Sequence, residues 1–527
     1  MMSNLENHFD LKLVAKHSEY EEYYSLSDEF ESTCFCIQSR FSYVWLTDII
    51  VTKGHDTNSF NLKYYFINVE KFHFFSINID CKLSDQVKSI AHLWQNAVVF
   101  EQEIGELYGV KFSRQYDPLY FANDFFPMSI NKNNSEKSPV ALEETEDYNC
   151  IYHPRINLFK NNYELKLKLE DNLVSTCRVG SGKYHVGFEQ ILQQKTLKDT
   201  YFNIENYFPR NSLLWSHLLS FGLESEQQIE VSNKAKAIRM VLLELDRVMS
   251  HIQFIIEVSA QFGVEILYSQ AVGWLKRLQS LMINYSGNEY GKNIIRFGGV
   301  TKSISHDWLS RTTNEIVWLE SSILSLYKTL IQGEHFRDTF DIPLITKKDV
   351  DLWGVTGPLA RAIGVNLDLR KINPIYYYAD IEFDVPIGVK GTGFDLFSIR
   401  IEEIFQSFKI IVQVLNNLPS GSIMADNLNS FLSYRSGERQ LDEVSYKSSV
   451  ENYLTVKDTK AVSLFEGASG VYGLNVDIKG NQVDRIKFNS PSFVLKKLFE
   501  QTIVARELYT VEPLWSLFNI NLKEIER

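Results

Sequence analysis

Two glycine-rich segments contain residue types that hold phosphate groups in other proteins. Gly180-Ser181-Gly182-Lys183 resembles the end of a phosphate-binding loop, in which backbone N–H groups and a lysine contact the phosphates. The complete motif needs a glycine at Cys177 and a serine or threonine at Tyr184, and this chain has neither. Gly388–Gly393 lacks the strand–turn–helix frame of a dinucleotide site. We therefore predict a tight turn for the first segment and an ordinary loop with positive φ angles for the second.

Thiol and imidazole groups are the usual metal ligands, but their spacing here predicts no metal site. The five cysteines all lie in the first third of the chain, and the eleven histidines are scattered without an H-x-x-x-H or H-E-x-x-H pair. An odd number of cysteines and the absence of a secretion signal over Met1–Asp10 predict reduced thiols. Cys34 and Cys36 are too close for a C-x-x-C pair. We predict that they lie on one face of a strand as small buried side chains.

Length and charge narrow the class of protein. The chain has 527 residues, 54 Lys and Arg and 66 Asp and Glu, and a formal net charge of −12. Nucleic-acid binding needs a basic face, so we expect no nucleic-acid partner. No segment approaches the roughly 20 apolar residues of a membrane span. These features predict a cytoplasmic protein with no transmembrane segment, and they leave open its docking onto a membrane protein.

The elements that must position any site divide into two groups, with a polar stretch between them. The first group predicts a small α/β domain over residues 1–127, and the polar and acidic stretch 128–150 is typical of a linker to a second domain, 151–527. In the first domain, β-branched and aromatic residues predict four strands, which precede a helical pattern over Asp85–Tyr108. The strands are Cys34–Gln38, Tyr43–Thr52, Leu62–Val69 and Phe72–Ile79.

The second group is mainly helical and has β-hairpins at its edges. Tyr163–Glu170 alternates apolar and charged residues, and Asp171-Asn172 suits the turn of a hairpin. Ser232 can cap a long amphipathic helix. The overall prediction is an α+β fold. The further elements expected are helices over Asn314–Leu330, Ile399–Leu418 and Ser492–Leu508, and a hairpin over Gly470–Asn489 with its turn at Lys479-Gly480-Asn481.

The first domain carries a family signature. Trp94–Val110 resembles W-x-x-A-x-x-x-E-R-E-x-x-D-(L/M)-(F/Y)-G-(I/V), which marks the small hydrophilic core subunit of respiratory complex I. In that family a D-(W/D)-x-x-x-P segment follows, and Asn123–Pro127 resembles a shortened version of it. The resemblance implies the small α/β domain of that subunit.

The second domain resembles the partner core subunit of complex I, in the same order along the chain. That subunit is related to the large subunit of energy-converting nickel-iron hydrogenases of the formate hydrogenlyase type. Both parts in one chain are similar to the fused C and D core subunits of NADH-quinone oxidoreductase, and the resemblance implies a hydrogenase-like helical domain. The matching segments are Gly182–Glu189, Ala237–Arg247, Phe297–Val300, Gly354–Lys371, Arg400–Glu403 and Ser490–Phe493.

The hydrogenase relatives hold nickel and iron through four thiolates, and this chain departs from them at all four positions. Phe208, Asn211, Leu514 and Leu517 occupy the lost ligand positions, and none of them carries a thiol, imidazole or carboxylate. The resemblance therefore implies no nickel-iron centre, no metal and no hydrogenase activity.

Complex I relatives use this region for a quinone headgroup, with a Tyr and a His as proton donors. The His turn resembles His153–Asn157, in which the first His is kept and Asn157 replaces the second. The Tyr position falls at Pro209, two residues from Tyr207, and Ala468-Ser469-Gly470 replaces an arginine-bearing turn. We expect Arg361, Asp368, Arg370, Glu402 and Glu403 to form a buried charged network, with structural ion pairing as the favoured role. The candidates for the quinone cavity or for coupling are His153, His185, Glu189, Tyr207, Arg361, Asp368 and Arg370.

The favoured functional interpretation is a peripheral core subunit of a membrane-bound complex I-like or hydrogenase-like oxidoreductase complex. It would couple an iron-sulfur subunit to antiporter-like, ion-translocating membrane subunits on the inner face of the cell membrane, with its own site altered or inactive. One alternative is a working NADH- or ferredoxin-quinone oxidoreductase subunit with non-standard donors, and another is a repurposed soluble scaffold. We expect no cofactor bound by this chain, quinone only in the working alternative, and NAD and iron-sulfur clusters only on partner subunits.

Overall fold

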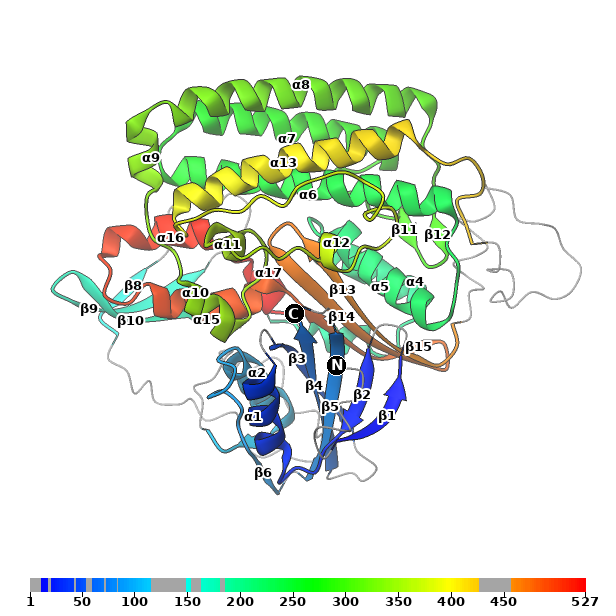
Figure 1. Ribbon diagram of the computed structural model, residues 1–527, viewed down its shortest axis with the longest axis vertical. Helices are drawn as coiled ribbons and strands as arrows, with labels where there is room; N and C mark the ends of the chain where they lie inside the picture. Colours follow the sequence, from blue (N-terminus) through cyan, green and yellow to red (C-terminus); the bar gives the residue numbers. More distant parts are fainter. Residues whose placement is uncertain are drawn as a thin grey trace, which may run out of the picture.

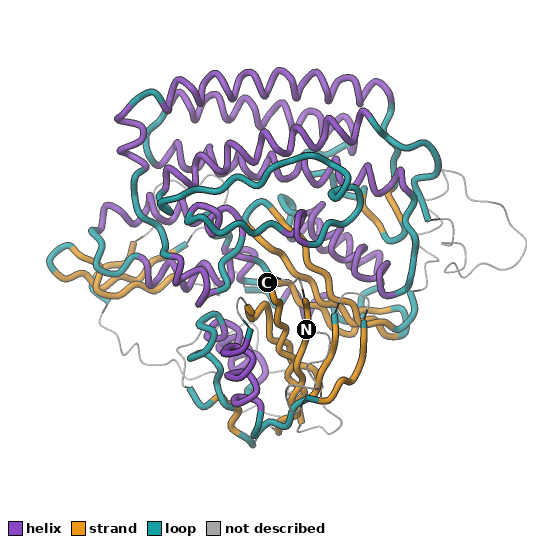
Figure 2. Tube along the Cα trace, viewed as in Figure 1, coloured by secondary structure: helices purple, strands orange, loops and turns teal. Residues whose placement is uncertain are grey.

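The computed structural model describes residues 11–17, 20–41, 44–53, 59–70, 73–82, 84–114, 148–152, 163–180, 185–425 and 456–527. They form two regions (Figure 1): a sheet with two helices over residues 12–112, and a larger region of long helices and small sheets. Figure 2 shows the same division by secondary structure. The predicted α+β class is confirmed. The domain limits stay predictions, because the linker over 128–150 lies almost wholly outside the described residues.

The N-terminal region is a five-stranded sheet in the order β1-β2-β5-β4-β3. Strands β2 and β5 are parallel, and the other pairs are antiparallel. The three long strands match the predicted ones to within a few residues, but the pattern over Asp85–Tyr108 yields a helix only from Ala97. The bounds are β1 (Lys12–Lys16), β2 (Glu21–Tyr24), β3 (Val44–Lys53), β4 (Ser59–Asn68), β5 (His73–Lys82), β6 (Gln86–Val87), β7 (Lys111–Phe112), α1 (Phe30–Arg40) and α2 (Ala97–Tyr108).

The strand predicted over Cys34–Gln38 is wrong, because these residues belong to helix α1. Phe30, Cys34 and Ile37 are buried at helical spacing, so this face of the helix packs into the core. Cys34 is fully buried, whereas Cys36 is only half-buried on a different part of the helix surface. The two thiols therefore do not share one face.

Long helices form the upper part of the larger region in Figure 1, where α6, α7, α8 and α13 run side by side. Ser232 caps α6 as predicted, since its Oγ accepts the Ala235 N–H at 3.2 Å. The bounds are α3 (Phe188–Leu192), α4 (Leu197–Tyr207), α5 (Ser212–Glu226), α6 (Asn233–Gln261), α7 (Glu265–Ser286), α8 (His306–Ile331), α9 (Glu334–Phe340), α10 (Lys347–Trp353), α11 (Gly357–Ala362), α12 (Leu369–Ile372), α13 (Gly393–Asn416), α15 (Pro491–Thr502), α16 (Val511–Phe518), α17 (Leu522–Ile525) and a 3-10 turn (Leu508–Thr510).

The predicted hairpins are confirmed. Leu165 and Leu167 point into the core from β9, and Asp171 and Asn172 make the turn to β10 with positive φ angles. The second hairpin, β14–β15, belongs to a three-stranded sheet with β13 that lies under the helices. The bounds are β8 (Cys150–Tyr152), β9 (Glu164–Glu170), β10 (Leu173–Gly180), β11 (Ile295–Arg296), β12 (Gly299–Val300), β13 (Thr459–Gly467), β14 (Gly470–Lys479) and β15 (Gln482–Asn489).

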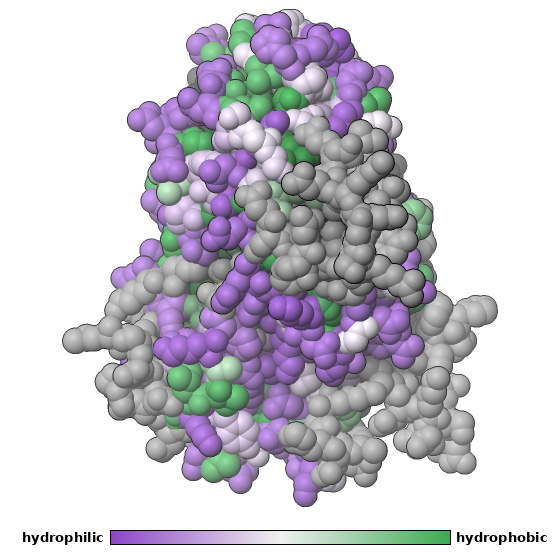
Figure 3. Space-filling view, turned by 90° about the vertical axis from the view of Figure 1, so that its right-hand side faces the viewer, coloured by the Kyte–Doolittle hydropathy of each residue, from purple (hydrophilic) through white to green (hydrophobic). Residues whose placement is uncertain are grey.

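The described residues on one face of the molecule are largely polar. Figure 3 shows a face on which hydrophilic side chains predominate, with smaller hydrophobic patches. Among the described residues, no helix combines the length and the apolar character needed to cross a bilayer.

A buried lysine joins the two regions, and from here on we call its surroundings the junction. Lys487 on β15 contacts Glu103 on α2 at 2.9 Å and Asp48 on β3 at 3.3 Å, and it donates to the carbonyl of Ile49. Arg527 adds a second pair to Glu103 at 3.1 Å. These ion pairs are almost fully buried. Removal of one partner would therefore leave an unpaired charge in the protein interior, which is costly.

Replacement of Lys487 by Met should strongly destabilise the protein, because it leaves two buried carboxylates short of their shared cation. We expect a loss of about 3–5 kcal/mol in the free energy of unfolding, measured by urea titration. Lys479→Met is the matched control, since Lys479 pairs with Asp484 on the same sheet at an exposed position. The control should lose less than about 1 kcal/mol. Equal effects of the two substitutions would contradict the role of the junction.

Candidate functional site

One face of α6 forms a wall of a partly open cavity. The lining residues of this helix recur every three or four positions, as residues on one helix face must. Five of these seven residues are polar or charged, and two are apolar. The α6 residues that line the cavity are Leu243, Asp246, Arg247, Ser250, Gln253, Phe254 and Glu257.

The opposite walls come from three other parts of the chain. The end of β13 and the turn into β14 contribute Glu466 and Ser469, the start of α5 contributes Arg210 and Asn211, and α17 contributes Glu524. The cavity offers about 60 Å³ to water-sized molecules, which is room for several waters. The walls are predominantly polar, so the cavity suits a ligand with oxygen or nitrogen atoms.

Asp246 differs from the other carboxyl groups of the cavity. Its residue surface is 6% exposed, and within the described part of the chain it makes no hydrogen bond and no ion pair. Burial raises the pKa of Asp246 to about 8, against the opposing charge of Arg247. The carboxyl group is therefore largely protonated at neutral pH, and it can donate a hydrogen bond into the cavity.

Two other acidic residues of the cavity are held by donors. Glu524 accepts hydrogen bonds from Ser492 at 2.9 Å and from the amide of Asn211. Burial raises the pKa of Glu524, and these hydrogen bonds oppose the increase. Glu466 accepts a hydrogen bond from the guanidinium of Arg361 at 2.9 Å. Both carboxyl groups therefore accept hydrogen bonds from other side chains of the protein.

Behind this cavity lies a buried ionic network centred on Arg361. Its guanidinium contacts Glu403 on α13 at 2.6 Å, Glu466 on β13 at 2.9 Å and Asp368 at 3.8 Å, and all four side chains are essentially inaccessible to solvent. Although burial opposes it, this surplus of negative partners raises the pKa of Arg361. Arg361 also donates to the carbonyl of Leu367 at 2.7 Å, which fixes the loop after α11.

The network continues to α6. Arg370 pairs with Asp368 at 2.7 Å and with Glu244 at 3.2 Å, and Arg247 lies 3.5 Å from Glu244. Burial would raise the pKa of Glu244, but Arg370 and Arg247 lower it. Arg247 also donates to the backbone carbonyl of Glu466, and it lines the cavity. One chain of contacts therefore connects the interior of the helical region with the cavity wall.

A histidine lies at the other end of the network. His251 lies 3.0 Å from Glu403 and 3.2 Å from Arg400. Burial lowers the pKa of His251 to about 4, so it is neutral at pH 7. Arg400 in turn donates to the carbonyl of Ala468 at 2.7 Å, in the turn beside the cavity. The network thus contains four guanidinium groups, Arg247, Arg361, Arg370 and Arg400, against four carboxylates, Glu244, Asp368, Glu403 and Glu466.

The structure brings together most of the residues expected in a charged network. Arg361, Asp368, Arg370 and Glu403 are all members. Glu402 is not, because it points to the exposed side of α13. The prediction that Glu402 belongs to the buried network is therefore wrong, because adjacent positions on a helix lie on different faces.

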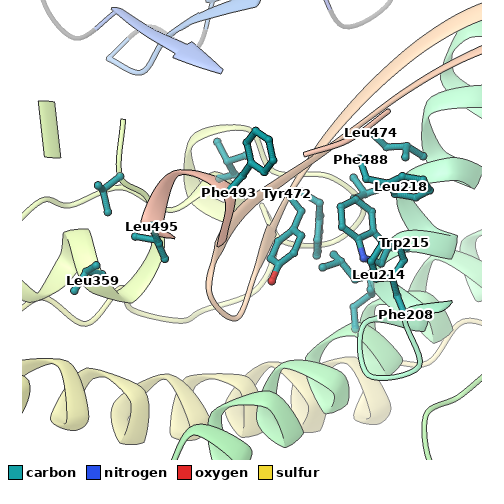
Figure 4. Packing of buried hydrophobic residues seen from close by; sticks show 14 of the residues in the cluster. Phe208, Leu214, Trp215, Leu218, Leu359, Tyr472, Leu474, Phe488, Phe493 and Leu495 are labelled. Carbon is teal, nitrogen blue, oxygen red and sulfur yellow. The ribbon is translucent and has the colours of Figure 1, made fainter. Parts of the chain in front are cut away.

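Tyr207 and Phe208 belong to an aromatic cluster beside the cavity. The Tyr207 ring stacks on Phe188 at 3.9 Å, and its hydroxyl donates to the carbonyl of Glu526 at 2.9 Å. Figure 4 shows Phe208 close to Trp215 and Phe488. Tyr207 is absent from the described lining of the cavity. A role for it as a proton donor stays a prediction.

His185 and Glu189 lie at the junction, away from the cavity lining. Glu189 pairs with Arg527 at 2.6 Å and accepts the Phe488 N–H at 3.0 Å. His185 is buried near the same arginine, and burial lowers its pKa. His153 lies outside the described residues, as does Asn157.

The side chains at the four positions predicted to be lost metal ligands do not fit a nickel-iron centre. Phe208, Leu514 and Leu517 are buried apolar side chains, and the Asn211 amide is occupied by Glu524. Soft metals need thiolate ligands, which none of these side chains supplies. Among the described residues, no group of three or more His, Cys, Asp or Glu side chains is arranged to bind a metal ion.

Asp246 and Glu466 are cavity residues that local sequence patterns did not single out. Glu466 reaches Arg361 across 105 positions of the chain, so no local spacing could indicate it. Asp246 carried no local signal either, because its neighbours on the same face of α6 are mostly polar or charged, and only the structure shows that it is buried. A buried carboxyl group is costly unless it is paired or neutral, and this makes it a candidate for function.

The sequence matches two families that cover separate parts of the chain. Residues 275–527 match the family described as respiratory-chain NADH dehydrogenase, 49 Kd subunit. Residues 25–133 match the 30 Kd subunit of the same enzyme. The first of these segments, in chain order, contains β3, β4 and β5 of the N-terminal sheet but not β1 and β2, and the other contains the C-terminal part of the larger region. The junction includes residues from both segments.

Individual relatives agree with these matches. The D subunit of NADH-quinone oxidoreductase from Magnetococcus marinus is 28% identical over 304 residues, covering 56% of this chain and 75% of the relative. The fused C/D subunit from Chromohalobacter salexigens is 22% identical over 451 residues, covering 77% of this chain and 75% of the relative. NADH dehydrogenase (ubiquinone) iron-sulfur protein 2 of Nephroselmis olivacea is 26% identical over 361 residues, covering 67% of this chain and 90% of the relative.

The unusual state of Asp246 gives a stability prediction. Its pKa is about 8 in the folded chain and about 3.9 when unfolded, so the folded state binds an extra proton between these values. Its contribution to stability is full below about pH 4 and is lost as the pH rises to 8. The Asp246→Asn variant has no carboxyl group to ionise at this position, so it does not lose this stability as the pH rises. Relative to the wild type, the variant should therefore gain about 1.4 kcal/mol per pH unit between pH 5 and 7, and less per unit as the pH approaches 8.

Urea unfolding at pH 5.5, 7 and 8.5 measures this difference. Asp351→Asn is the matched control, because Asp351 is an exposed aspartate on α10. Its difference from the wild type should not change with pH. A pH-independent difference for Asp246→Asn would show that Asp246 is ionised in the folded chain.

Proposed function

We propose that this chain, which resembles the fused 30 Kd and 49 Kd core subunits of complex I, is a peripheral core subunit of a membrane-bound oxidoreductase complex. In this role it couples an iron-sulfur subunit to an ion-translocating membrane arm. Its own site is altered relative to those of its relatives. The proposal concerns the assembled complex, and the chain acts within it as a scaffold and a coupling element.

The observation that carries the proposal is the continuous set of buried ion pairs. Arg361 and its carboxylate partners tie α11, α13 and β13 together, and Arg370 extends these ties to α6. Such a network resists independent movement of the elements, because breaking one pair leaves a charge in a low-dielectric interior. A displacement at the cavity wall is therefore transmitted to the helices behind it.

The residues at the expected donor positions support the proposal of an altered site. Asn157 stands at the second His position, and Pro209 stands at the Tyr position. Tyr207, the nearest tyrosine, donates its hydroxyl hydrogen bond to a backbone carbonyl. The usual general acids for a quinone headgroup are thus replaced or engaged elsewhere.

The relatives support a proposal for the partners and the location of the chain. Their names include NADH, quinone and ubiquinone, and this chain has no recognisable nucleotide motif among its glycine-rich segments. We propose that NAD and the iron-sulfur clusters belong to partner subunits. We place the chain in the cytoplasm, on the inner face of the cell membrane, held there by antiporter-like membrane subunits.

A second candidate is a working quinone-reduction subunit with non-standard donors. The cavity favours it, because its polar walls and the neutral carboxyl of Asp246 suit a ligand that accepts hydrogen bonds. The quinone carbonyl is such an acceptor. A repurposed soluble scaffold with no membrane partner is the third candidate, and purification from membranes separates it from the other two.

Purification of the tagged full chain from gently solubilised membranes tests the proposed complex. We expect an iron-sulfur subunit and antiporter-like membrane subunits to co-purify, as identified by mass spectrometry, and to be absent from an untagged control. A tagged chain recovered alone, under conditions that keep complex I intact, would contradict both complex-based candidates. It would leave the soluble scaffold.

Tyr207→Phe tests whether Tyr207 acts as a donor. The substitution removes one hydrogen bond to a backbone carbonyl and keeps the stacked ring, so we expect a loss of about 1 kcal/mol in stability. Quinone reductase activity of the purified complex should stay within about twofold of the wild type. An activity loss of about 100-fold or more would instead assign the donor role to Tyr207.

A further inference from the structure

We propose that a pocket at the junction binds one monovalent anion of halide size, such as chloride, between the N-terminal sheet and the three-stranded sheet β13–β15. The anion offsets a positive charge that the two regions leave unmatched, and it thereby favours their contact. The site shares no lining residue with the cavity beside α6, and it does not depend on the redox role proposed above. The arrangement of the pocket walls, their charges and the size of the pocket each support this assignment.

Two sheets enclose the pocket. One wall comes from β3 and from alternate positions of β4, which lie on one face of the N-terminal sheet. The other wall is a row across β13, β14 and β15, in which the strand register places three residues directly opposite one another, so that their side chains point to the same side. The first wall contains Thr52, Lys63 and Tyr65, and the row contains Lys460, Asp477 and Arg485.

Two lysines of the pocket already have carboxylate partners. Lys63 on β4 pairs with Glu22 on β2 at 2.8 Å. Lys487 on β15 also lines the pocket, and it pairs with Asp48 and Glu103 as described above. The partners of these two lysines lie outside the pocket lining, so their charges are balanced without any group inside it.

The remaining charges do not balance. Lys460 and Arg485 make no ion pair within the described part of the chain, and they lie on either side of Asp477 in the row. Asp477 is the one carboxyl group in the described lining, so two cations share a single anionic neighbour. One positive charge is left over, and a monovalent anion neutralises it.

Arg485 supplies the hydrogen-bond donor that an anion needs. Its guanidinium lies 4.9 Å from the centre of the Tyr108 ring. Among the described residues, the buried Nε–H of Arg485 has no hydrogen-bond partner. A buried donor without an acceptor is costly, and a hydrogen bond from a charged donor to an anion is strong. Burial also raises the pKa of Asp477, which disfavours its carboxylate form as an alternative partner.

The size of the pocket restricts the anion. About 20 Å³ is open to water-sized species, and one water needs about 10–15 Å³. A halide ion is only slightly larger than a water molecule, so one such ion fits. Phosphate, sulfate and organic anions are too large for this space. The site therefore suits chloride.

The first test measures chloride binding to the purified full chain. The NMR signal of chloride in sodium chloride should broaden in the presence of the protein, at constant ionic strength. Sodium bromide should relieve the broadening by competition, whereas sodium gluconate should not, because its anion is too large for the pocket. Broadening that gluconate relieves as well as bromide does would overturn the proposal.

Variants of the row test the position of the site. Arg485→Gln should weaken chloride binding by about tenfold or more, because it removes a charge-assisted hydrogen bond. Lys460→Met should weaken it less, since Lys460 is exposed. Asp477→Asn should instead strengthen binding, because it removes the opposing negative charge from the lining. Lys479→Met is the matched control on the same sheet, and it should leave binding unchanged.

Opposite effects of Lys460→Met and Asp477→Asn are the result that a merely structural role would not give. These two variants carry the test if circular dichroism shows that Arg485→Gln fails to fold. Equal broadening in the wild type, Lys460→Met and Asp477→Asn would overturn the proposal. In crystals grown with sodium bromide, an anomalous peak should lie between the two sheets beside Arg485, and bromide found only on the outer surface would contradict the site.

Discussion

The rest of the larger region depends on the burial of Arg361. A guanidinium cannot enter a protein interior without anionic partners, and Arg361 finds them on Glu403, Glu466 and Asp368. These partners come from three separate elements, so the requirement fixes α13, β13 and the loop before α12 around one point. Hydrophobic packing supplies most of the stability of such a fold, but it does not select one arrangement as strictly. The ionic network supplies that selection.

The same principle joins the N-terminal sheet to the helical region. Lys487 lies between carboxylates of the sheet region, and Arg527 at the end of the chain binds both Glu103 and Glu189. Two segments that match different families are therefore held together by buried charges and by their apolar surfaces. In a fused chain this contact is intramolecular, so the junction forms at a high effective concentration.

Local sequence patterns predicted the elements well and the site only in part. The alternation around Leu165 and the cap at Ser232 are short-range signals, and both are confirmed. The segment around Cys34 failed because its β-branched and aromatic composition suits a strand, whereas its burial follows helical spacing. Arg361, Asp368 and Arg370 lie in one short motif, so their network could be expected, but its partner Glu466 is 105 positions away from Arg361.

The side chains around the cavity determine which groups it could hold. At three of the four positions that were predicted to be lost metal ligands, Phe208, Leu514 and Leu517, the side chains are apolar and buried. The fourth, Asn211, turns instead to Glu524 and lines the polar cavity. The network behind the cavity balances its own charges, so a carboxyl added on the cavity side of α6 has no cation to pair with. Burial then keeps Asp246 protonated, and the scaffold itself turns an ordinary aspartate into a proton-holding group.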